Sequence, residues 1–298
     1  MTIRTLVVIA LTTGVLGFAP LAQADTGVIR VVIPGAFAAP IGTSADGQVT
    51  LQIGVGLPVF LANAAGAPTG GSTASVTFAE WTDTVVTPDF GAVSFLMVFR
   101  LPDGLMVIAA AVATPNGFAT SFSATPPYET LIGGWDIAFG PTTADALVTF
   151  TYDTNTHIKQ SGLVRFVAGN ALTSVATKSI PTVASVDVLR NIQVFGVSND
   201  AKDGALGFLT GHTASNITGH TSEVVQLRAV RLQAANLYLL YGCAFPTPAS
   251  GLTCLVGGTG FATHLSGTAH EIAGNLRKAT ISGVVDADLV LEVDASLP

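Results

Sequence analysis

The sequence contains few charged residues. Only 10% of its 298 residues are Asp, Glu, Lys or Arg, whereas about a quarter is usual in a globular domain. The 12 Lys and Arg residues are outnumbered by 19 Asp and Glu residues, so the formal net charge is −7. A chain with so few cations cannot neutralise a row of phosphates, and we exclude nucleic acid as a partner. Hydrophobic residues make up 49% of the chain, and this excludes an intrinsically disordered protein.

The sequence also lacks the common catalytic signatures. It has no G-x-S-x-G nucleophile elbow, no S-x-x-K pattern and no phosphate-binding P-loop. His270-Glu271 begins like the zinc motif H-E-x-x-H, but Gly274 stands where the second histidine is required. We therefore favour a non-enzymatic protein with no cofactor.

Long hydrophobic runs are absent after residue 24. The longest apolar stretches, 92–100 and 105–112, are separated by Pro102-Asp103-Gly104. Each is shorter than the roughly 20 residues that a membrane helix needs. We expect that the chain is not an integral membrane protein.

The first 24 residues have the three parts of a secretory signal peptide. A basic residue, Arg4, precedes an apolar run at 6–11, and the segment ends in Ala22-Gln23-Ala24. Such a segment is removed on export. We expect residues 1–24 to be cleaved and the mature chain to be extracellular or periplasmic.

The sequence has only two cysteines, Cys243 and Cys254. In an oxidising compartment an even pair favours a disulfide. The residues between them are rich in proline, glycine and serine, so we expect a covalent staple on a surface loop.

The main pattern in what remains is alternation with a period of two. Val49, Leu51 and Ile53 alternate with polar residues, and Val186, Val188, Ile192 and Val194 share one parity. Asp-Gly and Asn-Gly pairs recur between such segments and favour tight turns. These patterns predict an all-β, mostly antiparallel β-sandwich. We place one β-sandwich module at 25–168 and a second β-rich module at 169–298.

One segment, 222–241, is compatible with two structures. It contains neither glycine nor proline, and its apolar residues fall on one helical face. A single helix fits this spacing. Two strands joined at 233–236 fit equally well.

Acidic residues gather around one tryptophan and recur beside the other. Paired carboxylates near an aromatic platform are used by polysaccharide-active hydrolases. The candidate catalytic residues of this alternative are Glu80, Asp83, Asp89 and Asp136. Trp81 and Trp135 are the candidates for carbohydrate binding. Solvated strand ends and a packed tryptophan explain the same pattern.

Two further groups could ligate a metal. Oxygen-rich side chains at Asn199, Asp200 and Asp203 suit Ca²⁺ at extracellular concentration, although their spacing matches no EF-hand. Histidines occur in Gly211-His212-Thr213 and in Gly219-His220-Thr221, and later at His264 and His270. We interpret the histidines as solvent-exposed turn residues.

The function that we expect is that of a secreted, non-enzymatic structural or adhesion protein of the cell surface or extracellular space. A charge-poor surface offers little long-range repulsion between copies. We therefore expect the partners to be other copies of the chain or surface polymers.

Overall fold

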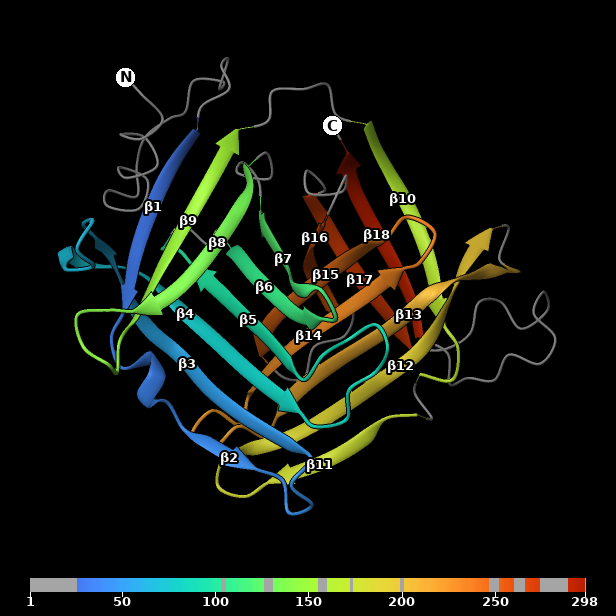
Figure 1. The fold of residues 1–298 in the computed structure, drawn as a ribbon, viewed down its shortest axis with the longest axis horizontal. Helices are drawn as coiled ribbons and strands as arrows, with labels where there is room; N and C mark the ends of the chain where they lie inside the picture. Colours follow the sequence, from blue (N-terminus) through green and yellow to red (C-terminus); the bar gives the residue numbers. More distant parts are fainter. Residues whose placement is uncertain are drawn as a thin grey trace.

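The computed structural model describes residues 26–102, 106–125, 131–154, 160–171, 174–198, 201–246, 252–259, 266–273 and 289–297. The predicted signal peptide lies outside these residues. Most of the described residues are in strands, which form two antiparallel sheets packed against each other (Figure 1). This confirms the predicted all-β, mostly antiparallel fold. Within the described ranges, no helix is long and apolar enough to cross a membrane.

The first half of the chain forms sheet A. In the described residues its spatial order is β7-β6-β5-β4-β3-β1-β9-β8, and β2 pairs with β3. A short 3-10 helix, η1 (Ala36–Ala38), follows β1. The strands are β1 (Thr26–Ile33), β2 (Ile41–Thr43), β3 (Val49–Ala62), β4 (Pro68–Asp83), β5 (Val93–Arg100), β6 (Met106–Thr114), β7 (Gly117–Ala124), β8 (Leu131–Phe139) and β9 (Ala146–Thr154).

Sheet A curls until its two end strands meet. β7 and β8 lie side by side without ladder hydrogen bonds between their described residues (Figure 1). The indole N–H of Trp135, on β8, donates a hydrogen bond of 3.1 Å to the backbone carbonyl of Ser121 on β7. One side chain therefore bridges the seam that the backbone leaves open.

The second half of the chain forms sheet B. β10 pairs with both β18 and β12, so the sheet closes on itself, and β11 pairs with the outer side of β12. The described strands are β10 (Gln160–Ala168), β11 (Ala176–Ile180), β12 (Ala184–Ser198), β13 (Ala201–Ser215), β14 (Glu223–Leu232), β15 (Leu237–Pro246), β16 (Leu252–Gly258), β17 (Ser266–Ala273) and β18 (Leu289–Leu297).

The two sheets divide the chain between Thr154 and Gln160. The predicted modules, 25–168 and 169–298, would assign β10 to the first half, whereas β10 pairs within sheet B. Whether the halves are independent domains stays a prediction.

The helix considered at 222–241 is wrong, and the alternative of two strands is confirmed. β14 and β15 form a hairpin in which Glu223 pairs with Pro246 and Leu232 with Leu237. Asn236 takes a φ of 51° in the turn, a conformation that asparagine adopts more readily than most residues. The apolar residues suggested a helix because both faces of these strands are buried, which hides the period of two.

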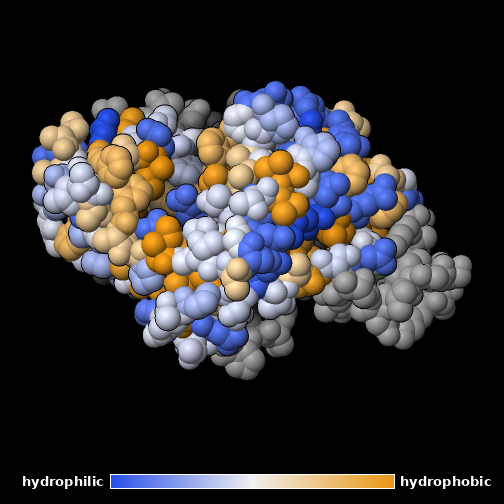
Figure 2. Space-filling view, turned by 60° about the horizontal axis from the view of Figure 1, so that its bottom comes forward, coloured by the Kyte–Doolittle hydropathy of each residue, from blue (hydrophilic) through white to orange (hydrophobic). Residues whose placement is uncertain are grey.

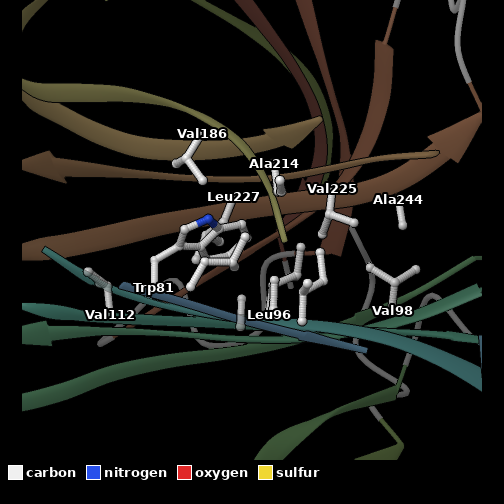
Figure 3. Close-up of a cluster of buried hydrophobic side chains, with 14 of the residues drawn as sticks. Trp81, Leu96, Val98, Val112, Val186, Ala214, Val225, Leu227 and Ala244 are labelled. Carbon is white, nitrogen blue, oxygen red and sulfur yellow. The ribbon is translucent and has the colours of Figure 1, made fainter. Parts of the chain in front are cut away.

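The main core lies between the sheets. From sheet A it receives alternate residues of β3 to β6, and from sheet B alternate residues of β12 to β16. Figure 3 shows the two layers, with Trp81, Leu96, Val98 and Val112 below and Val186, Ala214, Val225, Leu227 and Ala244 above. Two further apolar clusters fill the curl of each sheet on its other face. Both faces of the central strands are thus occupied.

The predicted disulfide is confirmed, but its setting differs from the expectation. Cys243 on β15 and Cys254 on β16 are bonded, with their Cα atoms 4.9 Å apart. Both cysteines are at least 98% buried and belong to the apolar cluster inside sheet B. The bond therefore joins neighbouring strands in a core rather than stapling a surface loop.

Candidate functional site

A buried ion pair joins the two sheets at the end of β4. Arg190 on β12 donates two hydrogen bonds to the carboxylate of Asp83, from Nε to Oδ2 at 2.7 Å and from Nη2 to Oδ1 at 3.0 Å. β12 has a register shift between Leu189 and Ile192, and Asn191 there has a φ of 54°. A bulge of this kind redirects the side chains beside it. Arg190 precedes the bulge and shares the parity of Val186 and Val188, so it faces sheet A, whereas Ile192 and Val194 after the bulge face the interior of sheet B.

His212 on β13 completes the buried polar cluster. Its ring stacks on that of Trp81, with centroids 5.6 Å apart and planes at 16°. Its Nδ1 is hydrogen-bonded to Ser94 Oγ at 3.0 Å. Its Nε2 lies 3.7 Å from Asp83 Oδ2, which is too long for a hydrogen bond. The interlayer cluster is defined here as Trp81, Asp83, Ser94, Arg190 and His212.

The environment of the interlayer cluster shifts the pKa values of Asp83 and His212. Burial opposes ionisation of Asp83, but its contacts with His212, Arg190 and the Val85 N–H outweigh this and hold the pKa of Asp83 well below its usual range. Burial lowers the pKa of His212; the carboxylate of Asp83 opposes this shift, and the nearby arginines add to it. At neutral pH the cluster therefore holds a carboxylate, a guanidinium and a neutral imidazole.

Ser94, His212 and Asp83 are the residue types of a hydrolase triad, but their arrangement does not match one. A triad needs a hydrogen-bonded histidine–carboxylate pair and a serine that a substrate can reach. Here the histidine–carboxylate contact is 3.7 Å long, and Arg190 already occupies both carboxylate oxygens. All three residues are at least 95% buried. The geometry suits cohesion between the sheets.

Four ion pairs between described residues, the Asp83–Arg190 pair among them, join the two halves of the chain. Each links a residue of the first half to a residue of the second: Asp83 with Arg190, Arg100 with Glu223, Asp46 with Lys178, and Asp89 with Arg231. Arg100 additionally donates a 2.6 Å hydrogen bond to the carbonyl of Ala244. A chain with few charges concentrates these pairs at one interface.

Sheet A has a second face, on the side away from sheet B, whose side chains are less buried at one end. Side chains two residues apart on a strand share a face, and the register of β2 to β7 places one set on the side away from sheet B. We call this set the open face of sheet A. It consists of Ile41, Thr43, Thr50, Gln52, Glu80, Thr82, Val93, Phe95, Ala111, Ala113, Phe118 and Thr120. Along the strands this face continues into the apolar cluster that contains Phe78, Met97 and Phe122.

The open face is only partly covered. Ile41 is 64% exposed and Phe118 is 62% exposed, while Gln52, Glu80 and Phe95 are half-buried. Trp135 borders the face, with its ring 5.6 Å from that of Phe95. Figure 2 shows the surface of the molecule in one view as a mosaic of apolar and polar patches. The two large exposed apolar side chains stand at opposite edges of the face, on β2 and β7.

Glu80 stands among these apolar groups. It lies directly opposite Phe95 on β5 and Gln52 on β3. Burial raises the pKa of its carboxyl. Within the described part of the chain, no cation or hydrogen-bond donor contacts this carboxylate.

The four candidate acids do not converge. Glu80 and Asp83 lie on opposite faces of β4. Asp89 lies in the loop after β4, where Arg231 Nε is 3.8 Å from its carboxylate. Asp136 is exposed on β8, on the face away from Trp135. Of the two candidate binding tryptophans, Trp81 is fully buried and Trp135 is half-buried.

The candidate metal ligands are placed only in part. Asn199 and Asp200 lie outside the described residues, and Asp203 is exposed. Among the residues that the structure describes, no three His, Cys, Asp or Glu side chains form a group that could hold a metal ion.

The interpretation of the histidines as exposed turn residues is wrong for one and confirmed for another. His212 is 96% buried in the middle of β13, because its parity directs it toward sheet A. His220 is exposed in a turn. His264 and the side chain of His270 lie outside the described residues.

Two members of the interlayer cluster, Ser94 and Arg190, carry no motif in the sequence. The sequence feature that could have pointed to Arg190 is its position before Asn191 inside an apolar strand, because a lone arginine there requires a partner. Comparisons with protein-family models, with curated proteins and with solved structures found no match for this chain.

Proposed function

We propose that this chain is a secreted, non-enzymatic protein of the cell surface or extracellular space that acts by adhesion through the open face of sheet A. The carrying observation is the exposure of Ile41 and Phe118 on the open face of strands whose opposite side packs against sheet B. The proposed partners are surface polymers, with other copies of the chain as the competing partner.

The distribution of polar groups supports a role without catalysis. The acids that a hydrolase would need lie on different faces and loops, and Asp83 is bound by Arg190. A glycosidase brings two carboxyl groups to within roughly 5–10 Å across one cleft. The ion pairs between the two sheets instead hold them together as one body that can present an exposed face.

Localisation and adhesion are tested together in the secreting cells. The full chain with a C-terminal tag is followed by fractionation and by N-terminal sequencing. We expect a mature chain that begins at Asp25 and is bound to the outer surface. Recovery of uncleaved chain from the cytoplasm would overturn the proposal.

The contact surface is tested with serine substitutions. Ile41→Ser combined with Phe118→Ser should release the chain from the surface into the medium, because both side chains are more than 60% exposed and their loss leaves the core intact. Val28→Ser, a strand position of sheet A that is 45% exposed and faces away from the open face, is the matched control. Equal retention of both variants argues against the open face.

Carbohydrate binding is a second candidate, supported by the position of Trp135. This half-buried ring borders the open face beside Phe95, and aromatic faces pack well against the apolar side of a sugar ring. Affinity electrophoresis in gels that contain neutral polysaccharides tests it. Retardation that Trp135→Ala abolishes favours carbohydrate binding, and unchanged mobility in every gel excludes it.

A further inference from the structure

The half-buried carboxylate of Glu80 has no charged or hydrogen-bonding partner among the described residues. An acid among apolar side chains costs free energy unless it has a partner. Within the described ranges Glu80 has neither an ion pair nor a hydrogen bond, whereas Asp83, three residues later, is fully paired. The carboxylate oxygens of Glu80 are not among the buried unpaired atoms of the described residues, so a cation at the surface can reach them.

Aromatic rings lie near Glu80 on the same face of sheet A. Phe95 is its direct neighbour across the strands. The ring of Phe95 lies 6.1 Å from Phe78 and 5.6 Å from Trp135. Because the Trp135 N–H already donates to Ser121, what this ring offers a ligand is its π system. The faces of such rings are negative and attract cations.

The charge of the open face is of one sign. Glu80 is the single charged residue among its twelve members. No lysine or arginine of the face would repel a cation or attract an anion. A complementary ligand is therefore positively charged and has an apolar surface that can pack on the rings.

We propose that the open face of sheet A binds a quaternary ammonium group, with Glu80 as the counter-charge and Phe95 and Trp135 as the aromatic contacts. A methylated ammonium is weakly hydrated, so it gives up little water when it enters an aromatic surface. This inference names the ligand chemistry of the face used in the proposed function and rests on that proposal for its biological role. The binding itself does not depend on it.

The test uses the mature chain and two ligands of the same shape. Choline carries the charge, and 3,3-dimethyl-1-butanol is its neutral isostere. The chain has two tryptophans, so its NMR spectrum has two indole N–H signals. Choline should shift the Trp135 signal in a saturable manner and leave the Trp81 signal unchanged, because Trp81 is fully buried. The neutral isostere should bind at least tenfold more weakly.

Two variants and a matched control assign the residues. Glu80→Gln should raise the Kd for choline at least tenfold, and Phe95→Leu should raise it severalfold. Asp136→Asn removes one negative charge from the exposed, opposite side of β8 and should change the Kd less than twofold. If Glu80→Gln fails to fold, the two-ligand comparison on the unaltered chain still decides.

Three results would overturn the ammonium site: no saturable shift with choline, equal affinity for the isostere, or equal losses in Glu80→Gln and Asp136→Asn. Binding of phosphatidylcholine vesicles without binding of choline would assign the face to a lipid surface and also reject the site. If choline fails to bind while Ile41→Ser with Phe118→Ser still releases the chain from the cell surface, only this inference fails and the adhesion proposal stands.

Discussion

Glu80 and Asp83 lie three residues apart on β4 and have opposite environments. Asp83 faces sheet B, is 96% buried and receives two hydrogen bonds from Arg190. Glu80 faces away, is half-buried and has no partner within the described residues. The pKa of Asp83 is lowered by its contacts, while burial raises the pKa of Glu80. Burial disfavours the charged form of both carboxyls, and the contacts of Asp83 reverse the direction of its pKa shift.

The two faces of β4 differ in what their polar groups do. On the buried face of β4, polar groups are satisfied within the protein and stabilise the packing of the sheets. On the open face, Glu80 has no partner among the described residues, and its neighbour Phe95 is half-buried beside Trp135. Removing one side chain at a time tests this difference between the two faces.

The largest effect is expected for Asp83→Asn. This change leaves the guanidinium of Arg190 without its counter-charge in a buried interface. Breaking a buried pair costs about 3–5 kcal/mol, and we expect about 3 kcal/mol because the side chain of Arg190 is 20% exposed. Urea unfolding at pH 7 measures it. A loss below about 1 kcal/mol would show that the pair contributes little to cohesion.

The next effect depends on pH and belongs to His212. Its pKa is lowered in the folded state, so the unfolded chain binds the proton more tightly. Stability is therefore complete above pH 6.5, the ordinary value, and declines as the pH falls below it, by at most about 1.4 kcal/mol per pH unit for one proton. His212→Gln should remove this dependence between pH 6.5 and 5. His220→Gln, at an exposed turn, should retain it.

A smaller loss is expected for Trp135→Phe. The phenyl ring keeps the contact with Phe95 but cannot donate to the Ser121 carbonyl across the seam. A single hydrogen bond contributes about 1 kcal/mol, so unfolding should be easier by about that amount. Amide exchange in β7 and β8 should quicken more than in β4. Phe139→Leu, at a position that is 67% exposed, is the control and should change stability by less than about 0.5 kcal/mol.

The smallest effect is a gain in stability from Glu80→Gln. A raised pKa in the folded state means that stability is present at low pH and is lost as the pH rises through that pKa. The neutral amide removes this loss. Because the group is half-exposed, we expect a gain of only about 0.5 kcal/mol at pH 7, and none at pH 4. A decrease at pH 7 would mean that the carboxylate contributes to folding, contrary to the comparison.

The fold class was predictable because alternation and turn pairs act locally. Val49, Leu51 and Ile53 do share one buried face. The same rule failed for β12, where Val186 and Val188 face sheet A while Ile192 and Val194 face the interior of sheet B. The bulge at Asn191 inserts a residue and reverses the parity. Nothing in the period of two marks such an insertion.

The interlayer cluster could not be predicted from the sequence, for a different reason. Asp83 and Arg190 are 107 residues apart, and their contact depends on how two sheets pack. The sequence did single out Asp83 and Trp81 as candidate site residues. Whether an acid is catalytic or forms a buried ion pair depends on the strand that packs against it, which for Asp83 is β12. Spacing along the chain could not bring Ser94, Arg190 and His212 together.

The pairing of β10 with β18 has a consequence for the order of folding. β18 lies between β10 and β17 in sheet B, so that sheet stays incomplete until residues 289–297 have emerged. Sheet A is complete once β9 has emerged, at Thr154. During synthesis or export from the N-terminus, sheet A would therefore form first, with the apolar face around Trp81 uncovered. Such intermediates aggregate readily, so the nascent first half is the stage at which a chaperone is most needed.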